Sequence, residues 1–495
     1  MQKTIALITI NSKEQLYSIT EDNGFSAVQP NIIMALLKSH LEQMGFHVVT
    51  MDETLSLTIA QYVEEIGRID PLLVGVICSG SNPSASTMSM VGAIQFFQEF
   101  NKSKKTASFV QGGHPSVLPQ RTLRETGADF VVKGEGYGTI AELAEFMASQ
   151  EQLCSPLRTL KSIRGLAFND GNGEMVDTGF PELADVNTLA PVNWDDMDPK
   201  KYRAHNWHCF GHMGHRSPYG VIWTSFGCPY ACEFCCINNV FGKRSYRLRT
   251  MSSVLAEIDD LVVNHGVENI KIMDELFVID HPRMEEFYQG LKTRGYNLNM
   301  WAYARMDSVN EPLLCKLKSV GMNWVAYGIE SVSDATLQGV SKRYDLGKHE
   351  ETIRMTRNAG MNICADVIAG LWDDTRNDMQ RTYDWCVSHN FEWLNIYPMF
   401  AYPGTPMYDK FISNGHMQAP TDWNSYALYG YSCSPMHSKS MSAREILQWR
   451  DEKFMAYHSR PEYLDMLQSK FGIDTRRHVE SMVSFKLPRR LLEKP

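Results

Sequence analysis

The sequence predicts an α/β protein with two parallel β-sheets in one chain, followed by a helical C-terminal segment. Two observations predict this fold class. Strand-like apolar runs alternate with amphipathic helical patterns over residues 1–150, and a second series of the same kind runs over residues 216–415. The composition agrees, because 43 % of the 495 residues are hydrophobic and 21 % are charged. That apolar fraction can build large cores and excludes disorder as the dominant state.

The first series predicts a doubly wound, Rossmann-like sheet over residues 1–150. Its strands are expected at 4–10, 47–51, 72–78, 107–111 and 129–132. Its helices are expected at 30–44, 59–66, 87–100, 119–125 and 139–147. Such sheets bind ligands at the carboxyl ends of their strands. Those ends carry small or glycine-rich turns, which let a large ligand approach the backbone closely: Ser79-Gly80-Ser81, Gly112-Gly113-His114-Pro115 and Gly134-Glu135-Gly136. None of these turns is the GxGxxG fingerprint of a nicotinamide cofactor.

Residues 151–215 are less periodic and predict a connector that wraps around the domains. They contain a hairpin-type turn at 169–173 and a stretch rich in Pro and Asp at 191–199. A histidine group with one cysteine ends this connector. We interpret the group as polar residues that contact a cofactor or substrate, since no zinc-ligand spacing is present. Its members are His205, His208, Cys209, His212 and His215.

The second series predicts a parallel sheet curled into a partial or full barrel over residues 216–415. Its strands are expected at 221–225, 269–273, 298–303, 324–329, 363–369 and 393–398. Helices are expected between them at 251–265, 283–294, 312–320, 348–359 and 378–389. Residues 416–495 then predict helices that either cap the barrel mouth or pack as an appendage. Their aromatic residues fit a substrate pocket or simple core packing: Trp423, Tyr426, Tyr429 and Tyr431.

Charge and hydropathy limit the function classes. The net charge of −9 argues against a general nucleic-acid binder, which needs a basic surface. No apolar run approaches the roughly 20 residues of a membrane span. The first residues resemble a strand rather than a signal peptide, so we expect a cytoplasmic protein. Disulfides are rare there, and the odd count of 11 cysteines needs another explanation.

The cysteine triplet Cys228-x3-Cys232-x2-Cys235, directly after a predicted strand, is the sharpest motif. Three thiolates on one short loop can hold three irons of a 4Fe–4S cluster and leave one iron open for a small ligand. Cys236 follows at once, and its side chain is expected to point away from the cluster. Zinc sites prefer paired CxxC units, and the sequence has no second pair.

With Phe234 before its last cysteine, this motif resembles that of radical S-adenosylmethionine (radical SAM) enzymes. The resemblance implies a (βα)6 partial TIM-type barrel, a 4Fe–4S cluster, and reductive cleavage of S-adenosylmethionine (SAM) to a 5′-deoxyadenosyl radical. Further stretches fit it: Lys271 to Phe277, Tyr327-Gly-Ile-Glu-Ser331, Val367 to Leu371 and Tyr402-Pro-Gly-Thr-Pro406. The residues it implies as SAM contacts are Asp274, Glu275, Arg305, Glu330, Ser331 and Gly370.

A Rossmann-like domain placed before such a barrel resembles the cobalamin-binding subclass of these enzymes. The residues that the resemblance places near cobalamin are Ser79, Gly112, Gly113, His114, Gly134, Glu135 and Gly136. The DxHxxG motif of histidine-ligated cobalamin is absent from residues 1–150. We therefore expect a cobalt without a protein lower ligand, and His114 as a turn residue.

The leading hypothesis is a cobalamin-dependent radical SAM enzyme that methylates an unactivated carbon of a small molecule. The resemblance also implies an electron donor such as flavodoxin or ferredoxin. A radical cyclase, oxidase or rearrangement enzyme that binds cobalamin without methyl transfer stays open, as does a sensor without turnover. A methylthio-transferring enzyme is disfavoured, because no second cysteine triplet lies upstream. No catalytic side chain and no substrate identity can be assigned from the sequence.

Overall fold

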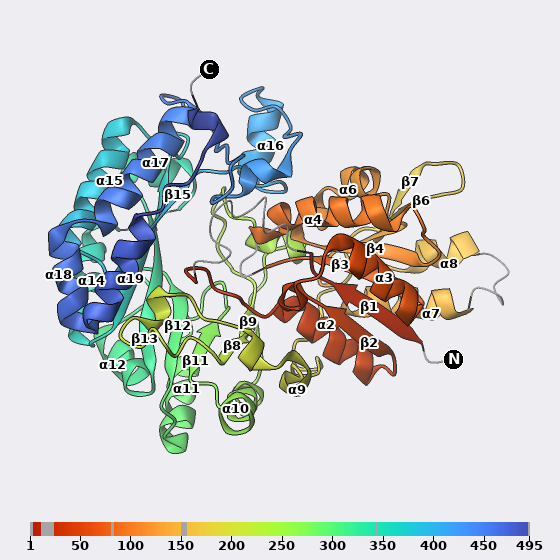
Figure 1. Ribbon diagram of the computed structural model, residues 1–495, viewed down its shortest axis with the longest axis horizontal. Coiled ribbons are helices and arrows are strands. Elements are labelled where there is room, and N and C mark those ends of the chain that lie inside the picture. The colour runs from red at the N-terminus through yellow and green to blue at the C-terminus, as the bar shows by residue number, and fades with distance from the viewer. Residues whose placement is uncertain (1–2, 11–23, 81–83, 150–155, 343–344, 494–495) are drawn as a thin grey trace.

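The computed structural model describes residues 3–10, 24–80, 84–149, 156–342 and 345–493. The chain forms two lobes that lie side by side (Figure 1). The N-terminal sheet and its helices form one lobe. The second sheet and the C-terminal helices form the other. The predicted fold class is confirmed.

The N-terminal lobe contains a seven-stranded sheet in the order β2-β1-β3-β4-β5-β6-β7. The first five strands in sequence are parallel, and β1 lies between β2 and β3. The chain therefore changes direction across the sheet at β1 and β3, and ligands bind at such a switch point. The strands are β1 (Thr4–Ile8), β2 (His47–Met51), β3 (Leu73–Cys78), β4 (Ala107–Gly112), β5 (Phe130–Val132), β6 (Leu166–Asn169) and β7 (Met175–Asp177).

Helices cover this sheet. They are α2 (Ile32–Gln43), α3 (Ile59–Ile69), α4 (Ala85–Phe100), α5 (Gly113–Val117), α6 (Pro119–Thr126), α7 (Tyr137–Ser149) and α8 (Pro156–Ser162). Helix boundaries follow local signals. Asn31 caps α2 by accepting from the Met34 amide at 3.0 Å, and Thr58 and Gln61 form a capping box on α3.

The connector contributes to the N-terminal sheet, which the sequence did not indicate. The strands β6 and β7 pair antiparallel with their neighbours and extend the sheet beyond β5. The predicted hairpin-type turn joins them: the Asp170 amide donates to the Glu174 carbonyl at 2.9 Å. The helix α9 (Trp194–Met197) follows, and the chain then passes to the second lobe.

The second lobe contains a six-stranded parallel sheet in the order β15-β14-β13-β12-β11-β8. In the part of the chain that the structure describes, β8 and β15 are its two edges, so the barrel is partial. The strands are β8 (Tyr219–Ile222), β11 (Asn269–Ile272), β12 (Asn299–Ala304), β13 (Met322–Glu330), β14 (Asn362–Ala369) and β15 (Trp393–Pro398). The helices are α10 (Met251–Asp259), α11 (His281–Arg294), α12 (Glu311–Ser319), α13 (Asp334–Gly339), α14 (Gly347–Asn358) and α15 (Arg376–His389).

The expected strand at 221–225 is split in the structure. β8 ends at Ile222, and Ser225 and Phe226 form the short β9, which pairs antiparallel with β10 (Arg247–Leu248). The cause is Asp274, whose carboxylate accepts hydrogen bonds from the Thr224 amide, the Thr224 hydroxyl and the Ser225 hydroxyl, each at 2.6 Å. These bonds turn the chain out of the sheet just before the cysteine triplet.

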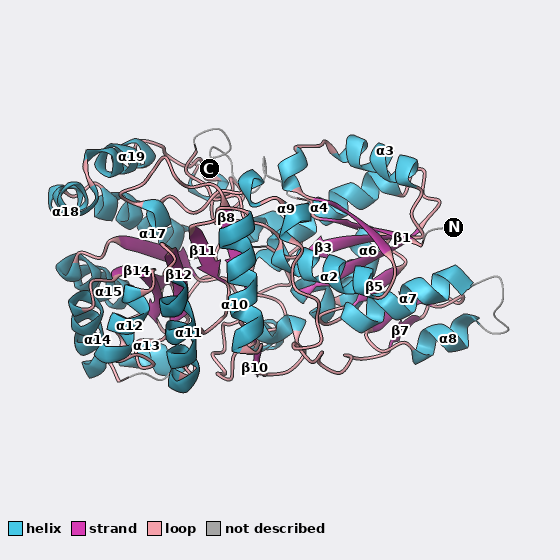
Figure 2. Cartoon of the chain, turned by 90° about the horizontal axis from the view of Figure 1, so that it is seen from below, coloured by secondary structure: helices cyan, strands magenta, loops and turns pink. Residues whose placement is uncertain are grey.

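The C-terminal segment is helical as predicted and covers the β15 edge of the barrel. It contains α17 (Ala443–His458), α18 (Pro461–Phe471) and α19 (Ile473–Val483), and α16 (Pro406–Ser413) precedes it. The buried Arg450 of α17 donates to the Ile396 carbonyl of β15 at 2.7 Å. Figure 2 shows α17, α18 and α19 gathered on the barrel at the end far from the N-terminal sheet. Among the described helices, none is long and apolar enough to cross a membrane.

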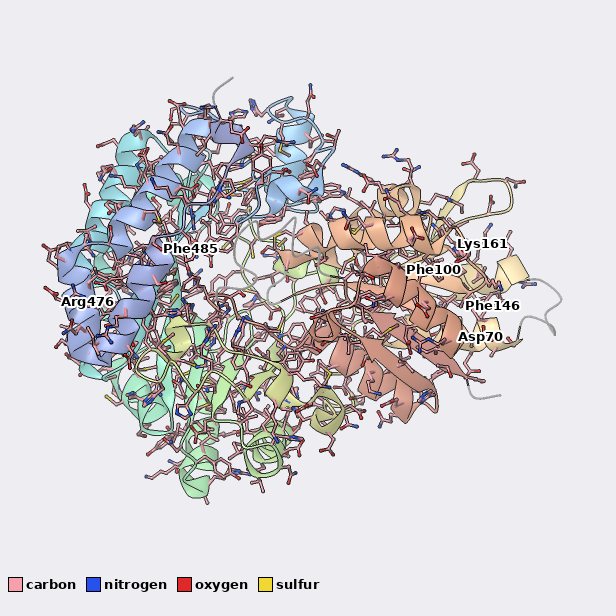
Figure 3. All side chains as sticks on the ribbon, viewed as in Figure 1. Asp70, Phe100, Phe146, Lys161, Arg476 and Phe485 are labelled. Carbon is pink, nitrogen blue, oxygen red and sulfur yellow. The ribbon has the colours of Figure 1, made fainter. Side chains whose placement is uncertain are left out.

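The two lobes share their cores. One apolar cluster contains Phe96 of α4 together with Trp423, Tyr426 and Leu447 from the C-terminal segment. Figure 3 places Phe100 and Phe146 in the N-terminal lobe and Phe485 on the C-terminal helical layer. The C-terminal segment therefore packs against both lobes.

Candidate functional site

A cavity of about 1040 Å³ lies between the lobes. Its walls come from the β1 and β3 ends of the N-terminal sheet, the connector, the barrel lumen and the C-terminal segment. Pockets for a single small molecule usually measure about 300–1,000 Å³. This cavity is therefore large enough for more than one bound molecule.

The cysteine loop forms part of the barrel wall, and the backbone fixes its start. Gly227 has φ +88°, and a Cβ there would lie 2.6 Å from the Ser245 carbonyl oxygen. Only glycine fits this turn. The Gly227 amide donates to Glu275 Oε2 at 3.1 Å. Further along, the Glu233 amide donates to the Val340 carbonyl at 3.0 Å, which ties the loop to the barrel.

Cys228, Cys232 and Cys235 all line the cavity, and Cys236 does not. Burial raises the pKa of the three thiols, while Arg305 beside Cys228 and Lys342 beside Cys232 oppose that rise. Such nearby cations favour thiolates, which are the ligands of iron–sulfur clusters.

The three thiols fit the ligand set of a 4Fe–4S cluster. All three line the cavity, and three thiolates can hold three irons and leave the fourth open for a small ligand. In the described residues, no three His, Cys, Asp or Glu side chains form a site for a single metal ion.

The acidic pair after β11 divides between two roles. The Glu275 carboxyl lines the cavity, and burial raises its pKa to about 8. Asp274 is buried and does not line the cavity, because its carboxylate is occupied by Thr224 and Ser225. Asp274 fixes the start of the cysteine loop. It was expected to contact SAM, but it is not part of the cavity wall.

Arg305 and Glu330 both line the cavity. The Arg305 guanidinium lies 4.0 Å from the centre of the Tyr230 ring and forms two 2.9 Å bonds to Asp307. Glu330 pairs with the buried Lys342, whose ammonium also donates to the Gly328 carbonyl at 2.9 Å. Glu330 has φ +64°, which is rare for a residue with a side chain and is typical of functional positions.

Two other predicted SAM contacts lie away from the cavity. The Ser331 hydroxyl is within 3.3 Å of the Thr382 hydroxyl and accepts from the Ser333 amide. Gly370 has φ +82°, and a Cβ there would lie 2.6 Å from Ile446 of α17. Both residues serve packing and turn geometry in this structure.

Among the predicted cobalamin contacts, Ser79 lies on the cavity wall and the others do not. The Ser79 hydroxyl donates to Asn31 Oδ1 at 3.0 Å, and Asn31 also lines the cavity. Ser81 of the same turn lies outside the described residues. The wall around Ser79 is mostly small and neutral: Thr9, Gly80, Ser84, Ala85 and Ser89. In the described N-terminal residues, this wall contains no histidine. Such a wall fits a large flat ligand such as a corrinoid.

The turn at 112–114 serves packing. A Cβ at Gly112 would lie 2.2 Å from the Cys78 carbonyl oxygen. His114 is a buried residue of α5, and its ring lies 4.4 Å from that of Trp423. Burial lowers the His114 pKa to about 3, with a smaller contribution from Arg121. His114 is thus a neutral packing residue.

The turn at 134–136 contacts the connector. Glu135 forms a 2.8 Å ion pair with Arg247 and accepts from the Ala184 amide at 3.2 Å. A Cβ at Gly134 would lie 3.1 Å from Pro181. This turn joins the lobes behind the cavity.

The residues of the barrel lumen were not among the predicted site residues. Lys271 on β11, Tyr303 on β12, and Cys364, Asp366 and Asn395 on β14 and β15 all line the cavity. Their signal was the alternation of polar and apolar residues, which places every second side chain inside a barrel. Two members of the histidine group are exposed, His212 and His215, whereas His205 lines the cavity, 2.7 Å from Gln29.

The C-terminal aromatic residues divide between the two expected roles. Tyr426 and Tyr429 line the cavity. Trp423 packs against His114 and lies under the Arg121 guanidinium at 4.0 Å. Tyr431 is exposed and donates to Glu493 at 2.8 Å.

Comparisons with known proteins agree with this arrangement. Residues 224–386 match the model of the radical SAM superfamily, and residues 25–144 match that of the B12 binding domain. The first match contains the cysteine loop and most barrel strands. The second contains most of the N-terminal sheet.

Curated relatives include an uncharacterized methyltransferase of Pyrococcus horikoshii, 25 % identical over 82 % of this chain and 83 % of its own length. The anaerobic magnesium-protoporphyrin IX monomethyl ester cyclase of Cereibacter sphaeroides is 24 % identical over 68 % of this chain, which spans 53 % of that cyclase. Among solved structures, the radical SAM methyltransferase TsrM of Kitasatospora setae, with cobalamin and a 4Fe–4S cluster bound, has a TM-score of 0.68 at 16 % identity, covering 98 % of this chain and 99 % of TsrM. That likeness shows a shared fold.

Proposed function

We propose, from the premise that this chain is a cobalamin-binding radical SAM enzyme, that it transfers a methyl group to a carbon atom of a small molecule. Its cofactors are a 4Fe–4S cluster, SAM and cobalamin. One observation carries the proposal: a single cavity has the cysteine loop on one wall and the β1–β3 switch point of the B12 binding domain on another. When bound, the cluster supplies the electron that cleaves SAM, and the corrinoid carries the methyl group.

In this proposal each side chain has a defined task. Cys228, Cys232 and Cys235 hold three irons of the cluster. Glu275, Arg305 and Glu330 bind SAM, because they line the cavity beside the cysteine loop. Carboxylate and guanidinium groups match the charges of its amino-acid end. Ser79 and Asn31 lie against cobalamin.

The proposal includes an electron donor of the flavodoxin or ferredoxin type and a reducing compartment, the cytoplasm. The described cysteines are all free thiols, which supports that compartment.

The test uses anaerobic protein with a reconstituted cluster, a reductant and SAM, with and without cobalamin. We expect 5′-deoxyadenosine in both samples and S-adenosylhomocysteine only with cobalamin, because methyl transfer from SAM leaves that product. Absence of S-adenosylhomocysteine at saturating cobalamin, with a cell extract as substrate source, would refute methyl transfer.

A radical cyclase is the second candidate, favoured by the similarity to the magnesium-protoporphyrin IX monomethyl ester cyclase. A cyclase would form 5′-deoxyadenosine with no cobalamin-dependent S-adenosylhomocysteine. The same assay therefore separates the two functions.

A further inference from the structure

The barrel lumen contains a carboxyl group that the proposed function does not use, that of Asp366 on β14. Asp366 lines the cavity, and its partner in the strand register is Asn395 of β15. Two residues earlier on β14, Cys364 pairs with Trp393, and both also line the cavity. These four side chains form one polar group inside the barrel.

Hydrogen bonds fix the orientation of this group. The Trp393 indole N–H donates to Asn395 Oδ1 at 2.8 Å, so the amide nitrogen of Asn395 must face the other way. That nitrogen donates to Asp366 Oδ1 at 2.8 Å, and the Cys364 thiol lies 3.8 Å from the same oxygen. The neighbouring strand thus holds one oxygen of Asp366 in place.

The other oxygen of Asp366 faces the cavity. Within the described part of the chain, Oδ2 accepts no hydrogen bond. It is also not one of the fully buried polar atoms that lack a partner, so it is exposed to the cavity. An oxygen that is open to the cavity can accept a hydrogen bond from a ligand that brings a donor, and a charged donor makes that bond stronger.

The surroundings favour a cationic donor on a flat body. Aromatic side chains line the lumen beside Asp366: Tyr303, Trp393 and Tyr397. The nearest acidic neighbour, Glu330, is paired with Lys342. Burial raises the pKa of Asp366 to about 7, and the Asn395 hydrogen bond opposes that rise. A bound cation would keep this carboxyl ionised.

We propose that Asp366 determines substrate specificity by binding a protonated amine of the substrate, whose aromatic or flat apolar body lies between the lumen aromatics. The proposal names the substrate class of the proposed methyl transfer and rests on that function. It predicts discrimination between an amine and a carboxylate on the same ring.

The test measures binding without turnover, in anaerobic protein loaded with cluster and cobalamin but without reductant. The probes are 2-phenylethylamine and 3-phenylpropionate, followed by ligand-observed NMR. We expect wild type to bind the amine at least about tenfold more tightly than the acid, and Asp366→Asn to lose that preference. Equal binding of both probes by wild type, or a preference retained in Asp366→Asn, would overturn the proposal.

Asp52→Asn is the matched control. Asp52 also lines the cavity, but its Oδ2 already accepts from the Tyr202 hydroxyl at 2.7 Å. The amine preference should persist in this variant. Its loss there as well would overturn a specific role for Asp366.

Two further measurements keep the test decisive. SAM affinity should stay within about threefold of wild type in Asp366→Asn; a larger loss with unchanged amine binding would assign Asp366 to SAM instead. In wild type, amine binding should weaken at least about fivefold from pH 8 to pH 6 as Asp366 takes up a proton, and unchanged binding would count against the proposal. The titratable groups facing Asp366 are Cys364, Tyr303, Tyr397 and the Glu330–Lys342 pair. Because no turnover is measured, failure here leaves the methyl-transfer assay standing.

Discussion

The barrel wall and the N-terminal wall of the cavity are built from different chemistry. The barrel wall presents three thiols and the ionisable side chains of Lys271, Glu275, Arg305, Glu330 and Asp366. Along the described N-terminal wall, the charged side chain is Asp52, and Tyr202 and Thr54 occupy its carboxylate. The remaining side chains on that wall are neutral, and most of them are small.

The difference teaches how each wall works. The barrel wall carries thiols and ionisable groups, whose proposed tasks are to hold the cluster and to bind charge, and a single substitution removes such a group. The N-terminal wall contributes the shape of the cavity. That shape depends on how the residues behind the wall are packed. Substitutions on the barrel wall should therefore change chemistry, whereas substitutions behind the N-terminal wall should change stability.

The largest expected effect is that of Cys232→Ala. Loss of a residue that only hydrogen-bonds to a metal ligand already lowers metal affinity or activity about 10–100-fold. Loss of a direct ligand should therefore remove most of the bound iron and lower the rate of SAM cleavage at least about 100-fold. Iron analysis and 5′-deoxyadenosine assays check this. Cys236→Ala is the control, because Cys236 does not line the cavity and should retain iron and activity. Normal iron content in Cys232→Ala would contradict the cluster assignment.

Glu330→Gln should weaken SAM binding about 10–100-fold while the cluster is retained, because a carboxylate on the cavity wall is lost. The glutamine variant is preferable to alanine, because its amide oxygen can still accept a hydrogen bond from the Lys342 ammonium that pairs with Glu330. Equilibrium dialysis with SAM gives the affinity. Ser331→Ala, one residue away but outside the cavity, should change that affinity less than about threefold. If both variants changed the SAM affinity equally, residues of the cavity wall and residues outside it would not differ in their role in SAM binding.

Gly112→Ala tests the packing behind the N-terminal wall. Its Cβ would collide with the Cys78 carbonyl, and the φ of +147° suits glycine, so we expect a loss of about 3 kcal/mol in the free energy of unfolding. Gly138→Ala in α7 is the control, since a Cβ there meets nothing within 4 Å and alanine favours a helix by up to about 1 kcal/mol. Urea denaturation measures both. A stable Gly112→Ala variant with weakened cobalamin binding would instead indicate a direct cofactor contact.

His114→Phe should leave cobalamin affinity within about twofold of wild type. Its stability effect should depend on pH. The folded pKa of about 3 lies below the ordinary value of 6.5, so below pH 6.5 the unfolded chain binds more protons and wild type loses stability. The phenylalanine variant lacks this loss. The difference in unfolding free energy between the two proteins should therefore shift in favour of the variant by about 1.4 kcal/mol per pH unit between pH 6 and pH 4. A pH-independent difference would show that His114 titrates normally.

Tyr431→Phe should have the smallest effect. The hydroxyl donates to Glu493 at an exposed position, so the urea midpoint of unfolding should match that of wild type. Substrate-dependent turnover should be unchanged. Reduced turnover would place Tyr431 at the cavity together with Tyr426 and Tyr429.

The types of reactive side chain could be predicted from the sequence better than the surfaces on which these side chains lie. The alternation of strands and helices and the cysteine spacing are local patterns. The structure contains the two expected sheets, and the three cysteines line one cavity. The split at Thr224 was not predictable, because it depends on Asp274, fifty residues away. The β1–β3 switch point follows from strand order, which no local pattern contains. The sequence could not show what the glycines at 112 and 134 lie against. Glycine is required where the backbone comes close to a ligand, and it is equally required where the backbone comes close to Cys78 or Pro181, as it does here.

The shared core of the two lobes has a consequence for how the protein is made. The cavity wall includes residues from Thr9 to Leu492, and the apolar cluster behind the N-terminal sheet includes Trp423 and Leu447. A nascent chain that has not yet reached Trp423 therefore lacks one side of the cavity and part of the N-terminal core. The complete binding chamber forms only once the segment that contains Trp423, Leu447 and Leu492 has been synthesised, so loading of cofactors into the finished chamber follows the synthesis of that segment.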